Sequence, residues 1–363
     1  MKTNENLLST YNLGKLTLKN RVSLAPMTRM SADDDGSAND RMARYYERFA
    51  AGGFGLILTD ATYPDEQYSQ GTFNQPGIAN EAHLQAWKAS TAAVHAQGSK
   101  IILQVAHAGA VSQGNRYRSG TVAPSAVVPL GADPNHSAPK ELSVQEIKEI
   151  IDGFVQAALR AEQAGFDGIE LHGANGFLLD EFLTDYTNRR QDEYGGSTER
   201  RTRFMTELIE AVKDKVSDRM VVGIRISQSK INDFTHKWAN GEKDAEIIFS
   251  AIGKAKADYI HITEYNSLLP AFKDSRSTLI ELAKKYGKTT VIANGQLDQP
   301  IDASKALEIG ADLVSLGKPA LANHDWPIRV SKNLPIDDFT GEVLSPLPTI
   351  KDNELYQENK GYE

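Results

Sequence analysis

The stretch Gly168-Ile-Glu-Leu-His172-Gly-Ala-Asn175-Gly-Phe177 contains the strand end around which the fold is predicted. It begins as a short apolar run, typical of a buried strand, and changes to small residues once the histidine appears. His172 and Asn175 stand three residues apart on a turn rich in glycine, where both side chains can offer N–H groups to one ligand oxygen. A buried histidine beside a turn-forming asparagine fits the same residues. The rest of the sequence has to decide between these two interpretations.

Seven more short apolar runs alternate with amphipathic helical patterns. They cover residues 22–25, 54–59, 100–105, 220–226, 259–263, 289–293 and 313–316. Both faces of each run are apolar, which is typical of parallel strands covered by helices. A spacing of four between Phe204, Leu208 and Val212 predicts a helix over 198–215 that Ser197 caps. Eight strand–helix units in succession predict an α/β fold, a (β/α)8 TIM barrel. A doubly wound sheet is the alternative, but no Gly-x-Gly-x-x-Gly turn follows the first strand.

We expect residues 1–363 to form a single domain with three additions to the barrel. Residues 1–20 are predicted to form an N-terminal hairpin around Gly14, with strands over 7–13 and 15–19. Residues 108–142, after the third strand, are rich in glycine, serine and proline and are expected to be a long lid loop. A second excursion, 228–243, is expected to wall the same pocket through His236 and Trp238. The polar tail 334–363 is expected to lie over the barrel.

Composition narrows the class of protein. The chain is 40% hydrophobic and 24% charged, as in ordinary globular proteins, and its net charge of −8 is spread without a basic face for nucleic acid. It has no cysteine, which excludes disulfides, thiolate nucleophiles and cysteine-ligated metals. No apolar run reaches membrane-spanning length and no signal core precedes the first strand. We therefore expect a cytoplasmic monomer or homodimer that binds small molecules rather than nucleic acid or membrane.

Polar residues gather where the predicted strands end, which is where barrels keep their active sites. These ends carry Thr28, Asp60, Gln104, His172, Arg225, Glu264, Asn294 and Lys318. The turns Asn294-Gly295 and Gly317-Lys318 follow the last two strands, a position where barrels often bind phosphate through backbone N–H groups. Ordinary turns with a surface lysine would have the same sequence.

A group attached to that phosphate would reach Thr28, Ala61, Gln104 and Arg225. Gln104 can donate and accept at adjacent positions, as the uracil-like edge of a flavin requires. Arg225 can balance negative charge at the same edge, or it can form a buried ion pair with a carboxylate such as Glu170. A metal-dependent barrel hydrolase or lyase is the rival interpretation. The eight histidines include no His-x-His or His-x-x-x-His pair, and no third ligand accompanies Glu170 and His172.

Several motifs in order resemble those of the Old Yellow Enzyme family of FMN-dependent ene-reductases. They are residues 18–21, 25–29, 76–78, Gln104 with 107–109, 172–183, 188–197 and 317–323. The resemblance spans nearly the whole chain. It implies a barrel that holds FMN tightly without a covalent bond and is reduced by NADH or NADPH. Hydride would then pass to the β-carbon of an α,β-unsaturated carbonyl compound, with nitro compounds and quinones as further acceptors.

The resemblance also implies residue roles. Pro26, Thr28, Ala61, Gln104 and Arg225 would contact the flavin ring, and Asn294, Gly295, Gly317 and Lys318 would hold the phosphate. His172 and Asn175 would grip the substrate oxygen, with Phe177 beside the substrate. Drawing electron density toward that oxygen makes the β-carbon electrophilic.

Two positions depart from the family pattern. Phe177 stands where many members have a tyrosine that donates a proton, so the proton would come from water, from another residue such as Tyr265 or Tyr117, or from no dedicated acid. Lys318 stands where arginine is usual, which keeps the charge but loses the bidentate fork. A flavin-binding sensor or partner-binding protein with incidental reductase activity is a further alternative. The sequence predicts no preference between NADH and NADPH and no particular substrate.

Overall fold

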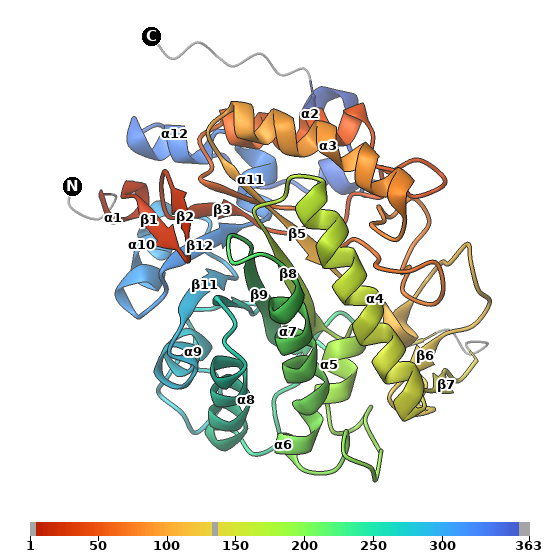
Figure 1. The fold of residues 1–363 in the computed structure, drawn as a ribbon. Helices are drawn as coiled ribbons and strands as arrows, with labels where there is room; N and C mark the ends of the chain where they lie inside the picture. The colour runs from red at the N-terminus through yellow and green to blue at the C-terminus, as the bar shows by residue number, and fades with distance from the viewer. Residues whose placement is uncertain (1–4, 133–136, 356–363) are drawn as a thin grey trace.

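Eight parallel strands close into a barrel in the computed structural model, which describes residues 5–132 and 137–355 (Figure 1). In chain order they are β3 (Val22–Leu24), β4 (Leu56–Leu58), β5 (Lys100–Val105), β8 (Gly168–Asn175), β9 (Val221–Lys230), β10 (Tyr259–Thr263), β11 (Thr290–Asn294) and β12 (Leu313–Leu316). The last strand pairs with the first, Val314 opposite Val22, and this pairing closes the cylinder. The (β/α)8 barrel predicted from the sequence is confirmed.

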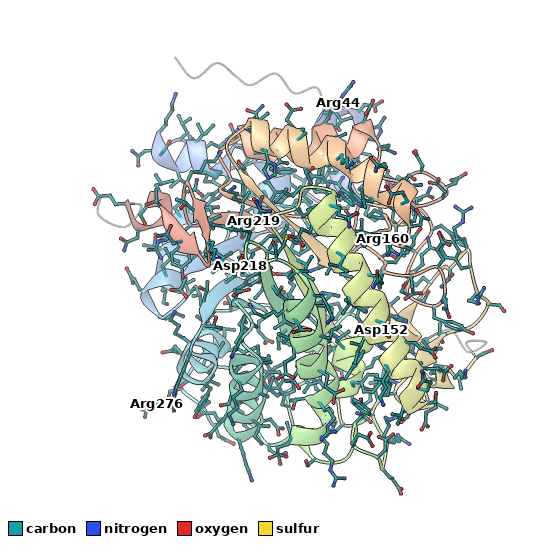
Figure 2. The ribbon with its side chains drawn as sticks, viewed as in Figure 1. Arg44, Asp152, Arg160, Asp218, Arg219 and Arg276 are labelled. Carbon is teal, nitrogen blue, oxygen red and sulfur yellow. The ribbon has the colours of Figure 1, made fainter. Side chains whose placement is uncertain are left out.

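Helices surround the barrel and follow the strands in order (Figure 1). They are α2 (Asp40–Ala51), α3 (Glu81–Ala96), α4 (Val144–Gln163), α7 (Arg203–Lys215), α8 (Glu242–Lys254), α9 (Leu279–Gly287), α10 (Pro300–Glu308), α11 (Lys318–Ala322) and α12 (Trp326–Ser331). Side chains start several of them: Ser143 and Glu146 form a capping box at α4, and Asn80 caps α3. Charged side chains of both signs are spread over the outside of the molecule, Asp152 and Arg276 among them (Figure 2). Among the described residues, no helix is both long and apolar enough to span a membrane.

The barrel interior is apolar at one end and polar at the other, because alternate residues of each strand point inward. Near the strand starts, inward residues pack into one cluster: Leu56, Leu58, Ile102, Val221, Tyr259, Ile292 and Leu313. Toward the strand ends the inward positions carry Gln104, Glu170, His172, Arg225, His261, Asn294 and Ser315. The side chains that could bind a ligand or take part in chemistry therefore lie at the carboxyl end of the barrel.

A small hairpin covers the apolar end. Strands β1 (Tyr11–Leu13) and β2 (Leu16–Leu18) pair antiparallel around Gly14, whose φ of +57° suits glycine. Leu13 and its neighbours Leu16 and Leu18 belong to the apolar cluster inside the barrel. The hairpin is shorter than predicted. Residues from Glu5 to Leu8 form a short helix, α1, which buries Leu7 in the main core instead of extending the strand; residues 1–4 lie outside the described part.

Two other elements differ from the sequence-based expectation. The helix predicted over 198–215 is divided into α6 (Thr198–Arg201) and α7 at Thr202. The Thr202 backbone keeps helical angles, and its hydroxyl donates to the Glu199 carbonyl. Ser197 stands at the N-cap position but makes no capping hydrogen bond through its side chain. The loop 108–142 contains the 3-10 turn η1 (Gly109–Val111) and a parallel pair, β6 (Val122–Ala123) with β7 (Lys140–Glu141); residues 133–136 are outside the described part.

The C-terminal segment runs back over the loop that follows β3. It contains the short 3-10 turns η2 (Glu342–Leu344) and η3 (Asp352–Glu354), and residues 356–363 lie outside the described part. Arg29, directly after Thr28, pairs with both carboxylate oxygens of Glu354 at 2.6 and 2.7 Å. This contact fixes the tail beside the carboxyl end of the barrel.

Candidate active site

Two cavities meet at the carboxyl end of the barrel. One has a volume of about 590 Å³ and the other about 420 Å³. Both are lined by Pro26, Thr28 and Arg225, and by Pro348 of the tail. The shared walls make them two arms of one site.

The residues expected at the phosphate line one cavity, and most of those expected at the ring and the substrate line the other. Asn294, Gly295, Gly317 and Lys318 line the larger cavity. The residues Ala61, Gln104, His172, Asn175 and Phe177 line the smaller one. The fold thus brings together all the site residues proposed from the sequence, although they come from seven of the eight strand ends.

His172 and Asn175 lie on β8 itself and not on the turn expected from the sequence, and hydrogen bonds hold the strand end that carries Asn175. Asn175 has a φ of +62°, unusual for a residue with a side chain, and its N–H donates to Ser227 Oγ at 2.8 Å. The next residue, Gly176, donates its N–H to Asp180 Oδ2 at 2.7 Å. Asp180 in turn forms a fully buried ion pair with Lys230, also at 2.7 Å. These contacts aim the Asn175 side chain into the cavity that His172 lines.

His172 is a neutral imidazole. Burial lowers its pKa to about 3, and the nearby positive charge of Arg225 acts in the same direction. Its ring meets the Phe177 ring edge-on, with 4.6 Å between centroids. Its Nδ1 is buried and has no hydrogen-bond partner among the described residues. The interpretation of a buried, fully satisfied histidine is therefore wrong.

Arg225 is buried but does not pair directly with a carboxylate among the described residues. One of its terminal nitrogens donates to Asn294 Oδ1 at 3.0 Å and to Thr263 Oγ1 at 3.2 Å. Its Nε has no partner in the described part of the chain. Glu170 instead accepts hydrogen bonds from Gln104 and His261, so the predicted alternative of an Arg225–Glu170 ion pair is not what forms. The Asn294 side-chain oxygen thus accepts from Arg225, and its amide nitrogen donates to the Ser315 carbonyl.

Some residues of the site had no signal in the sequence. Leu344, Leu347 and Pro348 wall the cavities from the tail, and no motif links the tail to the strand ends. Ser315 could have been found, because it lies two residues before Gly317 on the same inward face of β12. Its hydroxyl is buried without a partner among the described residues.

Four other residues expected near the site lie elsewhere than the sequence suggested. His236 and Trp238 line neither large cavity; Trp238 packs against Phe249 in the core, and Ile231 reaches the smaller cavity instead. Tyr265 lines the larger cavity and is 73% exposed. Tyr117 lines neither cavity, and its hydroxyl bonds to another tyrosine, Tyr63. Neither tyrosine faces the cavity that holds His172.

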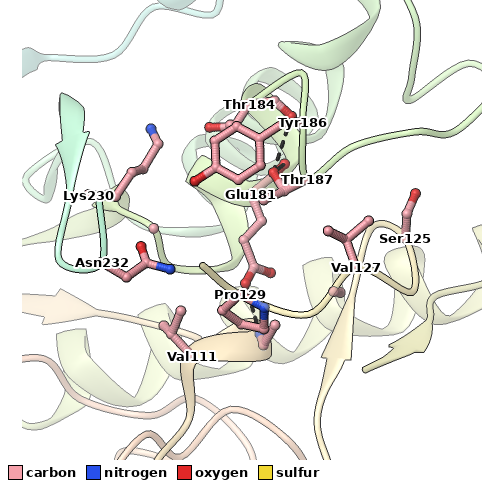
Figure 3. A pocket seen from close by; sticks show the side chains of 13 residues that line it. Val111, Ser125, Val127, Pro129, Glu181, Thr184, Tyr186, Thr187, Lys230 and Asn232 are labelled. Carbon is pink, nitrogen blue, oxygen red and sulfur yellow. Dashed lines mark hydrogen bonds between the residues drawn. The ribbon is translucent and has the colours of Figure 1, made fainter. Parts of the chain in front are cut away.

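A third, narrow hollow lies between the loop after β5 and the short helix α5 (Leu178–Leu183). Figure 3 shows Glu181, Tyr186, Lys230 and Asn232 around it. Its volume of about 10 Å³ has room for about one water molecule. Glu181 accepts the Ala110 N–H there, which ties α5 to η1, and burial raises its pKa well above the usual range. The hollow contains none of the site residues proposed from the sequence.

No group of three or more metal-ligating side chains comes together within residues 5–132 and 137–355. Histidine and carboxylate side chains do meet at Glu170 and His261, but as a hydrogen-bonded pair inside the barrel.

Comparison with known proteins agrees with this geometry. Residues 6–337 match the NADH:flavin oxidoreductase / NADH oxidase family. The chain is 34% identical over 337 residues to an NADH oxidase of Thermoanaerobacter brockii; the match covers 90% of this chain and 51% of that protein, so the chain spans about half of that relative's length. It is 36% identical to the putative 12-oxophytodienoate reductase 5 of Oryza sativa subsp. japonica, covering 92% of this chain and 90% of that one. The solved Old Yellow Enzyme homologue of Zymomonas mobilis superposes with a TM-score of 0.82 at 30% identity, covering 96% of this chain and 98% of that one.

Proposed function

Because the chain belongs to the Old Yellow Enzyme family of NADH:flavin oxidoreductases, we propose that this FMN-dependent NAD(P)H oxidoreductase reduces the carbon–carbon double bond of α,β-unsaturated carbonyl compounds, with nitro compounds and quinones as further acceptors. The observation that carries the proposal is the convergence of His172 and Asn175 on a cavity that Thr28, Gln104 and Arg225 also line.

The residues of the two cavities fit FMN. Arg225 Nε and Ser315 Oγ are buried without partners among the described residues, and buried polar atoms of this kind need a ligand to bond. Gln104 and Ala61 would flank the ring with Thr28 and Pro26. Gly295, Gly317 and Lys318 would surround the phosphate in the larger cavity, with Asn294 fixing Arg225. Bound FMN supplies a group that accepts hydride from NAD(P)H and passes it to the acceptor.

His172 and Asn175 would bind the carbonyl oxygen of the substrate. A neutral imidazole and an amide both donate N–H groups, and such donors stabilise the negative charge that develops on the oxygen as hydride adds to the β-carbon. Burial, together with the nearby guanidinium of Arg225, holds His172 in the neutral form. Nitro compounds offer an oxygen of similar geometry to the same two donors.

The second half of alkene reduction requires a proton at the α-carbon. Among the described residues, the smaller cavity is lined by no tyrosine, lysine or carboxylic acid, and Phe177 has no proton to give. Water is therefore the proton source in this proposal. Alkene reduction should be slow compared with quinone reduction, which needs no proton placed on carbon.

The test compares 2-cyclohexenone with a quinone, following NAD(P)H consumption and the saturated ketone product. Because a positioned general acid contributes about 10²-fold or more, Phe177→Tyr should raise the ratio of enone to quinone kcat/KM by at least about tenfold. Phe177→Leu is the control, since it changes the ring without adding a hydroxyl. No cyclohexanone from the unaltered enzyme would refute the alkene reductase proposal, and a Tyr variant that behaves like the Leu variant would show that proton supply does not limit the reaction.

A further inference from the structure

A chain of buried polar groups lies inside the barrel just below the smaller cavity. Glu170 stands on β8 two residues before His172, toward the apolar end. Its Oε1 accepts the Gln104 Nε2–H at 2.7 Å, and its Oε2 faces His261 Nδ1 at 2.8 Å. Glu170 and His261 are fully buried and line neither large cavity, whereas Gln104 does reach the smaller one. Glu170 therefore acts on the site only through its neighbours.

The first effect of Glu170 is on the orientation of an amide. An ionised carboxylate has no hydrogen to donate, so only the nitrogen end of the Gln104 amide can face it. The Gln104 oxygen and its second N–H are then free for the cavity. A flipped amide would set two oxygens against each other inside the barrel, at a cost that no solvent relieves. Glu170 thus leaves Gln104 one acceptor and one donor for a ligand.

The second effect is electrostatic. Burial alone would raise the pKa of Glu170, but His261, Arg225 and the Gln104 amide outweigh it and hold the carboxyl ionised. Burial lowers the pKa of His261, so the ring donates to Glu170 as a neutral group. The Arg225 guanidinium donates to Thr263 and Asn294 rather than to Glu170. A carboxylate charge without a directly bonded cation therefore lies beneath the cavity.

We propose that Glu170 is a positioning residue of the FMN site, which fixes the Gln104 amide in one orientation and places a negative charge that lowers the reduction potential of the bound flavin. The proposal rests on the location of FMN given above. Reduction adds negative charge to the ring, and a carboxylate beneath it disfavours that charge in a poorly screened interior. The positive charge of Arg225 raises the reduction potential, so the potential depends on the balance between Arg225 and Glu170.

The experiment measures the reduction potential and the FMN dissociation constant of purified, FMN-loaded variants. Glu170→Gln keeps an oxygen for the Gln104 amide and removes the charge. It should shift the reduction equilibrium toward the reduced flavin by at least about tenfold, which is about +30 mV for a two-electron couple. Glu170→Leu also removes the hydrogen-bond acceptor, and it should bind FMN at least about tenfold more weakly than Glu170→Gln. Asp244→Asn, a buried carboxylate on the outer helix α8, is the matched control and should change neither value.

An unchanged or lowered potential in Glu170→Gln would overturn the electrostatic part, and equal FMN affinity in the two Glu170 variants would overturn the orienting part. Should Glu170→Gln fail to fold, 15N spectra of ring-labelled histidine in the unaltered holoenzyme give a second test. His261 should be neutral with its proton on Nδ1 at pH 7, and a doubly protonated ring at that pH would cancel the charge and refute the proposal. Unchanged FMN affinity in Gln104→Ala would instead show that the flavin lies elsewhere, which is a failure of the proposed site.

Discussion

His172 illustrates how burial sets the chemistry of a single residue. The residue is 3% exposed and lies near the positive charge of Arg225, and both factors disfavour a second proton. A neutral ring can donate one hydrogen bond to a substrate oxygen without repelling the guanidinium beside it. The sequence places a histidine directly after an apolar run, but its protonation state depends on burial and on charged neighbours from two other strands, Arg225 on β9 and His261 on β10.

The low pKa of His172 predicts a loss of stability in acid. The folded pKa of about 3 lies below the unfolded value of 6.5, so the unfolded chain takes up a proton first as the pH falls. The stabilisation is complete above pH 6.5 and is lost as the pH falls toward 3; between pH 7.5 and 5 the loss is about 2 kcal/mol. Urea unfolding of the holoenzyme at both pH values should show a smaller loss in His172→Gln by about that amount. Asn175→Ala should keep the full loss, and equal losses in His172→Gln and the unaltered enzyme would contradict the prediction.

At the scale of elements, the C-terminal segment lines both cavities of the site and does not simply lie over the barrel. Arg29 holds it through both carboxylate oxygens of Glu354 and through the carbonyls of Pro348 and Thr349. Leu347 and Pro348 reach the smaller cavity from this segment. The sequence indicated a polar tail over the barrel, but nothing in it relates residue 29 to residue 354. Such a pairing depends on three-dimensional closure and has no local pattern.

Glu354→Ala should destabilise the protein by about 3 kcal/mol, because it leaves the buried charge of Arg29 without its carboxylate. Arg29 still donates to the carbonyls of Pro348 and Thr349 in this variant, so the loss of unfolding free energy should lie near the lower end of the usual range for broken buried pairs. Thermal and urea unfolding measure the change, and limited proteolysis should cut the tail faster. Asp352→Ala is the control: Asp352 is largely exposed and its partner Arg41 is only half-buried, so the expected loss is below about 1 kcal/mol. Equal losses in the two variants would refute the assigned role of the Arg29 contact.

At the scale of the whole molecule, the apolar packing inside the barrel and the candidate active site lie at opposite ends. Its apolar end is filled by the N-terminal hairpin, and its polar end forms the two cavities. All eight strands could be located from the sequence, since buried parallel strands leave continuous apolar runs. The parts that could not be predicted are those governed by side-chain hydrogen bonds, such as the loop contact of Glu181 and the choice of Asn294 and Thr263 as partners of Arg225.

The division of the barrel predicts that the hairpin can be weakened without affecting the site. Leu13→Ala removes a fully buried side chain from the apolar cluster and should cost about 2–5 kcal/mol of unfolding free energy. The reduction potential of FMN and the KM for the acceptor should stay the same, because the cavities lie at the other end. Asn12→Ala, exposed on the same strand, should cost less than about 0.5 kcal/mol. A changed potential in Leu13→Ala would show that the two ends are coupled.

The pairing of β3 with β12 and the contact of Arg29 with Glu354 also constrain how the protein is made. During synthesis on the ribosome, Thr28 and Gln104 emerge long before Gly317, Lys318 and Pro348. The strand edge of β3 stays open until β12 has left the exit tunnel, and the wall of the cavities is missing until the tail follows. A nascent chain therefore has no complete place for the cofactor. The complete site for FMN can therefore form only after the segment up to Glu354 has left the exit tunnel, late in the synthesis of the barrel.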